Sequence, residues 1–245
     1  MEFTFLGTGG YHPNDRRETS AVFLPEVGVL FDAGTGVYRL AERLRTSELD
    51  IFLSHAHLDH IIGLTYLLVP LMQGKLTKVR VHGAAEHLQA VREHLFAPAV
   101  FPVLPAYEFL PLTGDVAVAG GGVVRHVRLD HPGGSIGYRI DFAGGSLAYI
   151  TDTTAGGGDY TEFIRGVGVL IHECNFPDRY AEWAVKTGHS NVTPVIETAR
   201  SAGVGRLILT HFDPQTPGDD PVELASAKIE AIKVELAEDL RTYPF

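Results

Sequence analysis

The chain has 245 residues, of which 45% are hydrophobic and 20% are charged, and its formal net charge is −10 at pH 7. A chain of this size and composition can bury a large core, so we expect residues 1–245 to form a single α/β domain. The acidic balance argues against a long nucleic acid as partner, because affinity for polyanions comes largely from Lys and Arg.

The N-terminal half is predicted to mix strands and helices. Strand-like runs are expected at 2–6, 20–24, 27–32, 50–54 and 78–82, and helical patterns at 37–45, 64–72 and 84–95. Gly7, Gly9 and Gly10 lack the spacing of a dinucleotide fingerprint, so they indicate a tight turn. The segment 64–72 is unusually apolar, which fits a helix that pairs with a second copy in a homodimer or, equally, a helix buried in the core.

The C-terminal half begins with closely spaced strands between 107 and 150. Glycine-rich connections are expected at 120–122, as a hairpin, and at 156–158, as a flexible loop. Helical patterns follow at 194–202 and 221–240. The last of these has Asp220 as N-cap, Pro221 at the first helical position and Glu223 three residues after the cap. This order of elements predicts two β-sheets sandwiched between helices, an αββα architecture.

One short segment concentrates the candidate metal ligands. The chain reads S-H-A-H-L-D-H-I directly after an apolar run, which places His55, His57, Asp59 and His60 within six positions. Residues at i and i+2 that leave a strand project to the same side, so the first two histidines can reach one ion and the next two residues a second. Imidazole and carboxylate are ligands that suit zinc and related metals, so this segment predicts a metal site.

Two metal ions need more ligands than this segment supplies, and three candidates stand at the ends of predicted strands. They are His131, Asp152 and His211. Each residue by itself is more often structural, for example a turn or cap residue. Together they complete one chemically consistent set of ligands.

Several further segments fit the same interpretation. They read F-L-G-T-G-G, L-F-D-A-G-T-G around Asp32, H-P-G-G-S-I-G-Y-R-I, Y-I-T-D-T-T, I-H-E-C-N-F, G-H-S-N and L-I-L-T-H-F. Through these segments and the H-A-H-L-D-H box, nearly the whole chain resembles the metallo-β-lactamase superfamily, and within it the ribonuclease Z-like branch. The resemblance implies an α/β fold of the αββα type, with two mixed β-sheets flanked by helices.

The resemblance also implies a role for each candidate residue. One metal would be held by His55, His57 and His131, the other by Asp59, His60 and His211, with Asp152 as the bridge. Glu173 and His189 would supply a proton to the leaving group, so the expected catalytic residues are Asp59, Glu173 and His189. Asp32 would orient metal ligands through hydrogen bonds.

Protonation of the departing alkoxide is chemically reasonable for a histidine held by a carboxylate near neutral pH. The alternative for His189 is a loop histidine that bonds the backbone, because a helix start is predicted close behind it. His172, beside Glu173, is expected to be packed. Cys174, the single cysteine, is expected to be a buried thiol.

We therefore expect a dinuclear zinc hydrolase in which two ions share a bridging hydroxide that attacks a phosphodiester. Manganese or iron is the alternative metal. The alternative functions are an RNA endonuclease that processes the 3′ end of tRNA and a carboxylic ester or lactam hydrolase. β-Lactamases of this fold often place Cys where Asp152 stands, which favours the phosphodiester. Redox relatives tend to carry Glu at the position of His57, which weighs against a redox role.

Substrate size is inferred from a short connection. Relatives that process tRNA carry a basic arm between the segments matching His131 and Asp152, whereas only twenty residues separate these positions here, enough for a β-hairpin. The missing arm and the acidic charge favour a small phosphodiester, with RNA as the alternative partner. Arg17 is the best candidate for contact with a substrate phosphate.

The sequence indicates no contact with a membrane. It contains no run of about 18 apolar residues. Its start lacks a basic region followed by an apolar core. We therefore expect a cytoplasmic protein.

Overall fold

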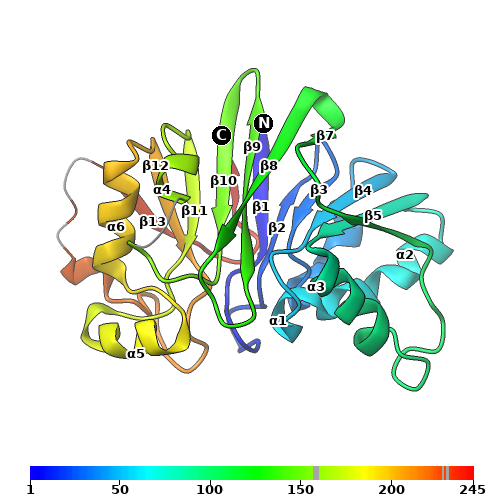
Figure 1. Cartoon of the computed structure of the whole chain (residues 1–245), viewed down its shortest axis with the longest axis horizontal. Coiled ribbons are helices and arrows are strands. Elements are labelled where there is room, and N and C mark those ends of the chain that lie inside the picture. The colour runs from blue at the N-terminus through cyan, green and yellow to red at the C-terminus, as the bar shows by residue number, and fades with distance from the viewer. Residues whose placement is uncertain (157–159, 228, 230–231) are drawn as a thin grey trace.

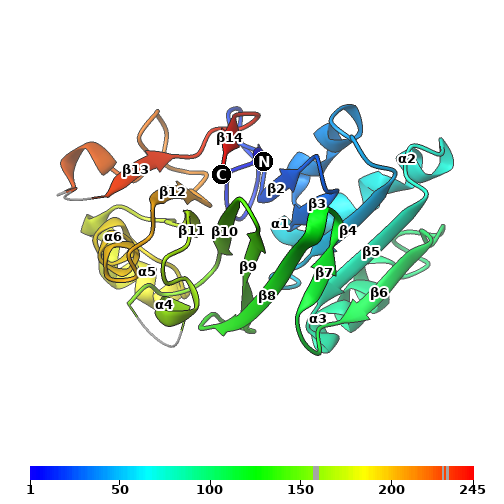
Figure 2. The same ribbon diagram turned by 90° about the horizontal axis from the view of Figure 1, so that it is seen from above.

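The computed structural model describes residues 1–156, 160–227, 229 and 232–245. Within these ranges, two seven-stranded mixed β-sheets face each other, and helices lie against their outer faces (Figures 1 and 2). This arrangement confirms the predicted αββα architecture.

The first sheet comes from the N-terminal half of the chain and the last strand. Its spatial order is β14 (Thr242–Pro244), β1 (Glu2–Gly7), β2 (Ala21–Leu24), β3 (Val29–Phe31), β4 (Glu48–Phe52), β5 (Lys78–Gly83) and β6 (Tyr107–Pro111). Strands β3 to β6 are parallel, and the other neighbours are antiparallel. The helical segments of this half are η1 (Thr35–Glu42), α1 (Leu58–Ile61), η2 (Ile62–Leu67), α2 (Leu68–Met72), α3 (Ala85–Ala90) and η3 (Val91–Leu95).

The second sheet comes from the C-terminal half. Its spatial order is β13 (Lys233–Leu236), β12 (Arg206–Thr210), β11 (Val169–Glu173), β10 (Gly145–Ile150), β9 (Ser135–Phe142), β8 (Gly122–Leu129) and β7 (Val116–Val118). Strands β10 to β13 are parallel, and β7 to β10 are antiparallel neighbours. The helical segments of this half are η4 (Ala119–Gly121), α4 (Tyr160–Phe163), η5 (Asp178–Tyr180), α5 (Ala181–Thr187), α6 (Val192–Ser201) and η6 (Leu224–Ser226).

Alternation along the strands separates two buried layers. In β2, Val22 and Leu24 pack between the sheets, whereas Phe23 packs under the helices of the first sheet. Successive strand residues project to opposite faces, so each strand contributes to both layers. The two sheets are also linked directly, because the Tyr138 hydroxyl donates a 2.6 Å hydrogen bond to the carbonyl of Leu53.

The helix predicted at 221–240 is wrong. Asp220 does cap a turn, since its carboxylate accepts hydrogen bonds from the backbone N–H groups of Leu224 and Ala225 at 2.7 and 2.9 Å, but that turn is only η6. The chain then forms β13, parallel to β12, and β14, which pairs with β1. Pairing with the open edges of both sheets overrides the local helical pattern. Residues 228, 230 and 231 lie outside the described ranges.

The other predicted helices lie within three residues of observed ones. The segments 37–45, 84–95 and 194–202 correspond to η1, to α3 with η3, and to α6. The segment 64–72 is divided between η2 and α2. Leu64 and Leu67 are buried, as expected of a core helix, whereas Val69 and Met72 are exposed, so pairing with a second copy stays a prediction.

Two remaining predictions concern loops and membranes. The hairpin at 120–122 is confirmed between β7 and β8, whereas most of the loop predicted at 156–158 lies outside the described residues. Over the described ranges, every helix is too short or too polar to cross a membrane.

Candidate metal centre

The predicted site residues meet at one edge of the sandwich, where six strands end. The residues and strands are Asp32 after β3, His55 after β4, His131 after β8, Asp152 after β10, Glu173 at the end of β11 and His211 after β12. Within each sheet these strands run in the same direction, so their carboxyl ends share an edge. The short helix α1, which carries Asp59 and His60, lies at this edge (Figure 1).

One group of donor atoms lies around the Oδ2 atom of the Asp152 carboxylate. The Nε2 atoms of His55 and His131 each lie 3.6 Å from Asp152 Oδ2. His57 belongs to the same group, in which one donor atom of each residue lies within 4.8 Å of all the others. Three imidazoles and a carboxylate oxygen are therefore directed at one small volume.

A second group of donor atoms lies around the Oδ1 atom of the same carboxylate. The Nε2 atoms of His60 and His211 each lie 3.3 Å from Asp152 Oδ1 and 3.2 Å from each other. Asp59 Oδ2 lies 3.2 Å from His60 Nε2 and 3.4 Å from His211 Nε2. Asp152 thus presents one oxygen to each group.

These residues fit metal ions better than they fit a hydrogen-bonded network. A tetrahedral ion with metal–donor distances of about 2.1 Å holds its donors about 3.4 Å apart. The distances of 3.2 to 3.6 Å between donor atoms given above are close to that value. His55 Nε2 and His131 Nε2 are buried and have no hydrogen-bond partner among the described residues. A buried nitrogen without a partner is costly unless something else fills that place, and a metal ion would do so.

The electrostatics of the centre also require positive charge. Burial raises the pKa of Asp152, but His211, His60 and His55 outweigh burial and hold this pKa well below its usual range. Burial lowers the pKa of His60, yet the neighbouring carboxylates, led by Asp59, raise it well above its ordinary value. In the metal-free protein the carboxylates therefore draw a proton onto an imidazole, and a bound cation would replace that proton.

Strained backbone marks the same residues. Asp32, Asp152 and His211 have φ values of 56°, 45° and 59°, in the left-handed region. Each follows the end of a strand, where this conformation turns the chain sharply. Such strain costs about 1–3 kcal/mol per residue and clusters at functional sites.

Asp32 orients two imidazoles from a fully buried position. Its Oδ2 atom accepts hydrogen bonds from His60 Nδ1 at 2.7 Å, from the Tyr149 hydroxyl at 2.8 Å and from Ser54 Oγ at 2.8 Å. Ser54 Oγ in turn lies 2.9 Å from His55 Nδ1. Because both Nδ1 atoms are engaged in this way, both Nε2 atoms are left to face the centre.

Asp32→Asn is expected to weaken zinc binding by about 10- to 100-fold, because an amide cannot accept all of these hydrogen bonds. Competition with a chromophoric chelator measures the change. Ser54→Ala is the matched control, since it keeps the bond between Asp32 and His60 and should lose less affinity. Unchanged affinity in Asp32→Asn would show that the carboxylate does not tune the centre.

Glu173 holds His189 beside the centre. The buried Glu173 Oε1 accepts hydrogen bonds at 3.1 Å from His189 Nδ1 and from the backbone N–H groups of Thr153 and Ser190. Burial lowers the pKa of His189, but the Glu173 carboxylate outweighs burial and raises it to about 9. His189 also lies within 4.8 Å of donor atoms of Asp152 and His211. Glu173 thus favours the protonated form of an imidazole that lies next to both donor groups in the metal-free protein.

Gly10 leaves room for a candidate ligand. A methyl group at this position would lie 2.5 Å from His211 Cε1, far inside van der Waals contact. Gly10→Ala is therefore expected to displace His211 and to lower turnover by about 100-fold, as a ligand misplaced by 1 Å can do. Gly114→Ala is the control, since nothing lies within 4 Å of its added methyl. Equal turnover in the two variants would contradict this packing argument.

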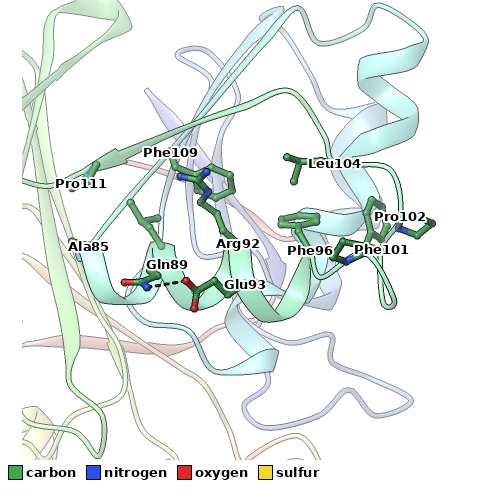
Figure 3. A pocket seen from close by; sticks show the side chains of 12 residues that line it. Ala85, Gln89, Arg92, Glu93, Phe96, Phe101, Pro102, Leu104, Phe109 and Pro111 are labelled. Carbon is green, nitrogen blue, oxygen red and sulfur yellow. Dashed lines mark hydrogen bonds between the residues drawn. The ribbon is translucent and has the colours of Figure 1, made fainter.

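A cavity of about 410 Å³ opens over the centre. His57, Asp59, Asp152, His189 and His211 line it, and aromatic side chains complete its wall. A larger hollow of about 670 Å³ lies over α3 and β6 (Figure 3), where Gln89 donates a 2.8 Å hydrogen bond to Glu93. The described residues that line this hollow include no His, Cys or Asp, so the candidate chemistry belongs to the smaller cavity.

The prediction that Arg17 contacts substrate is wrong. Arg17 is buried, and its guanidinium donates hydrogen bonds to Thr8 Oγ1 at 2.7 Å and to the carbonyl of Ala237 at 2.8 Å. The same group lies 4.4 Å from the centroid of the Phe212 ring. Arg17 therefore ties the N-terminal loop to the C-terminal segment and is not directed at the cavity.

The packed role predicted for His172 is confirmed, since it is fully buried and its Nε2 lies 3.2 Å from the Tyr160 hydroxyl. Cys174 is a buried free thiol, as expected. Tyr11 and Trp183, two aromatic residues outside the predicted site, also line the cavity. In the sequence these two residues stand out only by being aromatic, and residues of the core have the same property.

Comparison with known proteins agrees with this geometry. The family described as "Beta-lactamase superfamily domain" matches residues 28–212. Ribonuclease Z of Acaryochloris marina is 30% identical, with 99% of this chain and 97% of that protein covered. Ribonuclease Z of Methanosarcina acetivorans is 28% identical, with 98% and 96% covered.

Solved structures share the fold. The metallo-beta-lactamase fold protein YhfI from Bacillus subtilis aligns with a TM-score of 0.82 at 20% identity, over 99% of each chain. The short form of human tRNase Z aligns with a TM-score of 0.76 at 23% identity, over 100% of this chain and 99% of that one. A diphosphatase from the PhnP family aligns with a TM-score of 0.76 at 22% identity, over 100% and 97%.

The family match covers most of the chain, and the relatives align over nearly their whole length. The cluster of His and Asp donors lies at the edge where the strands of this fold end. The chain therefore belongs to the metallo-β-lactamase superfamily, in its ribonuclease Z-like branch, and is a metal-dependent hydrolase.

Proposed function

We propose that the protein is a dinuclear zinc phosphodiesterase that acts on a small substrate. The observation that carries this proposal is the position of Asp152, whose two oxygens face different histidine pairs at 3.6 and 3.3 Å. In this assignment His55, His57 and His131 would hold one ion, Asp59, His60 and His211 would hold the other, and Asp152 would contribute an oxygen to each. Manganese and iron are the alternative metals.

The residues around the centre have different roles in the proposed cleavage. Bound metal ions would lower the pKa of the attacking water and offset the negative charge of the phosphoryl group. Asp59 accepts a 2.8 Å hydrogen bond from the backbone N–H of Tyr11, which fixes the carboxylate at the centre. His189, held by Glu173, donates a proton to the departing alkoxide.

A small substrate is favoured by what lines and borders the cavity. The connection between His131 and Asp152 is the hairpin of β9 and β10, with no room for a projecting arm. Among the described residues that line the cavity there is no Lys or Arg to grip a long polyanion. The structural similarity to a diphosphatase is compatible with a small phosphate ester.

RNA cleavage is the second candidate, because the relatives that align over nearly their full length are named Ribonuclease Z. An ester or lactam hydrolase is the third. The pair of Glu173 and His189, 3.1 Å apart, suits a phosphodiester, because the departing alkoxide needs a proton.

The test is hydrolysis of bis(p-nitrophenyl) phosphate by the zinc-loaded protein, run beside a precursor tRNA and a β-lactam under the same conditions. We expect cleavage of the small diester and no cleavage of the tRNA. Cleavage of the tRNA would establish the ribonuclease function without an arm. Two bound zinc ions without turnover of either phosphodiester would overturn the proposal.

A further inference from the structure

One wall of the cavity carries an exposed tryptophan. Trp183, on α5, lines the cavity beside His189 and is 51% exposed, although it is one of the largest apolar side chains. Lys186 Nζ lies 4.8 Å from the centroid of the Trp183 ring, over one of its two faces. An aromatic ring that is half exposed at a cavity is typical of a surface that binds a ligand.

The helix that carries Trp183 is fixed to the centre at its other end. The backbone N–H of His189 donates a 2.9 Å hydrogen bond to the carbonyl of Ala184, in the last turn of α5. The carbonyl of Gly188, the next residue after α5, accepts a 2.9 Å hydrogen bond from His131 Nδ1. The position of the indole is therefore tied to a candidate metal ligand and to the candidate proton donor.

Charge around the cavity limits what this ring can bind. The described lining includes Asp59, Asp152 and Asp213 but no Lys or Arg, and the nearby Lys186 lies against the Trp183 ring, so the lining itself offers no cation to a second phosphate of the substrate. Tyr11 and Phe176 line the same cavity. An uncharged flat group attached to the scissile phosphate suits such a wall, because stacking on an aromatic ring needs no opposite charge.

We infer that Trp183 is the platform on which the base of a nucleotide phosphodiester stacks while its phosphate lies at the metal centre. The inference rests on the proposed phosphodiesterase function and names its substrate class. Stacking accepts any base, so the site selects nucleotides over simple alkyl esters without reading a sequence.

The first experiment compares two substrates that release the same p-nitrophenolate. One is the p-nitrophenyl ester of thymidine 5′-monophosphate, and the other is methyl p-nitrophenyl phosphate, which lacks the base. Trp183→Ala is expected to lower the ratio of their kcat/KM values by about tenfold, mainly through KM, because stacking on one base is lost. Trp183→Phe, which keeps an aromatic ring, should restore most of the ratio.

Tyr180→Ala is the matched control. Tyr180 is an aromatic residue three positions earlier in the chain, 46% exposed, and it does not belong to the described cavity lining. Its removal should leave the substrate ratio unchanged. An equal fall of the ratio in Tyr180→Ala and Trp183→Ala would overturn the inference, because it would indicate a general disturbance of α5.

A binding experiment uses the fact that Trp183 is the chain's single tryptophan. Thymidine 5′-monophosphate, added to the zinc-loaded protein, is expected to quench the tryptophan emission to saturation. 2-Deoxyribose 5-phosphate, which carries the same phosphate and sugar but no base, should not. The quenching should survive in Tyr180→Ala.

The outcomes separate the two proposals. No hydrolysis of either p-nitrophenyl ester would contradict the phosphodiesterase function itself. Hydrolysis of both substrates with a ratio that Trp183→Ala does not change would overturn only the stacking role. Equal quenching by the nucleotide and the sugar phosphate, or none by either, would also overturn it.

Discussion

Replacing Asp152 with Ala is expected to reduce bound zinc from the proposed two ions per chain to one or none and to lower phosphodiester hydrolysis by about 10³-fold or more. Asp152 is the residue that faces both donor groups, with Oδ2 toward His55 and His131 and Oδ1 toward His60 and His211. Its removal takes a ligand from each group at once. Metal analysis after gel filtration, paired with hydrolysis of bis(p-nitrophenyl) phosphate, measures both effects.

Asp152→Asn separates the loss of the bridge from damage to the backbone. Asp152 has a φ of 45°, a conformation that Asn tolerates better than Ala, and an amide keeps one neutral oxygen of nearly the same shape. This variant should retain one ion with little change in thermal stability and should lose most activity. Two zinc ions retained in both variants would contradict the bridging role.

The strand ends explain why so much of the site was predictable. His55, Asp152 and His211 each follow an apolar run, and the carboxyl ends of neighbouring parallel strands must meet at one edge of a sheet. Within the second sheet this topology brings Asp152 and His211 together, and the face-to-face packing of the two sheets adds His55, which follows β4 of the first sheet. The sequence needs no knowledge of loop conformation for this step.

The C-terminal segment and Arg17 show where local reasoning failed. The capping signal of Asp220 is real, but it supports only a short turn, because unpaired sheet edges bind the residues that follow. Arg17 looked like a free cation in a loop, yet it is buried against Phe212. Both outcomes depend on contacts between residues far apart in the sequence, such as Arg17 and Ala237, 220 positions apart, which no local pattern encodes.

The hydrogen-bond network around the centre was predictable only in part. It was less predictable than the residues at the strand ends and more predictable than the contacts of Arg17 and the C-terminal segment. Asp32 was expected to orient metal ligands, but its bonds to Ser54 and to Tyr149 follow from side-chain directions in two different sheets. Trp183 was missed because an aromatic residue in a short amphipathic helix is more often part of the core. Only its exposed fraction and its place in the cavity distinguish it.

His189→Ala is expected to leave zinc content unchanged and to lower cleavage of a thymidine dinucleotide by about 10²- to 10⁴-fold, the usual contribution of a general acid. Cleavage of bis(p-nitrophenyl) phosphate should fall only a few-fold, because p-nitrophenolate departs without a proton. A series of diesters with leaving groups of graded pKa measures the difference as a steeper dependence of rate on that pKa. An equal loss on both substrates would remove His189 from the acid role.

The pH profile supplies an independent check on the same residue. Glu173 outweighs burial and raises the pKa of His189 to about 9 in the metal-free protein, and bound cations nearby would lower that value. The imidazole donates a proton only below its pKa, so cleavage of the dinucleotide should fall as pH rises, starting at or below pH 9. This fall should disappear in His189→Ala. In Glu173→Gln the fall in cleavage rate should move to lower pH, because the amide no longer stabilises the imidazolium. A pH profile shared by the wild type, His189→Ala and Glu173→Gln would assign the titration to another group.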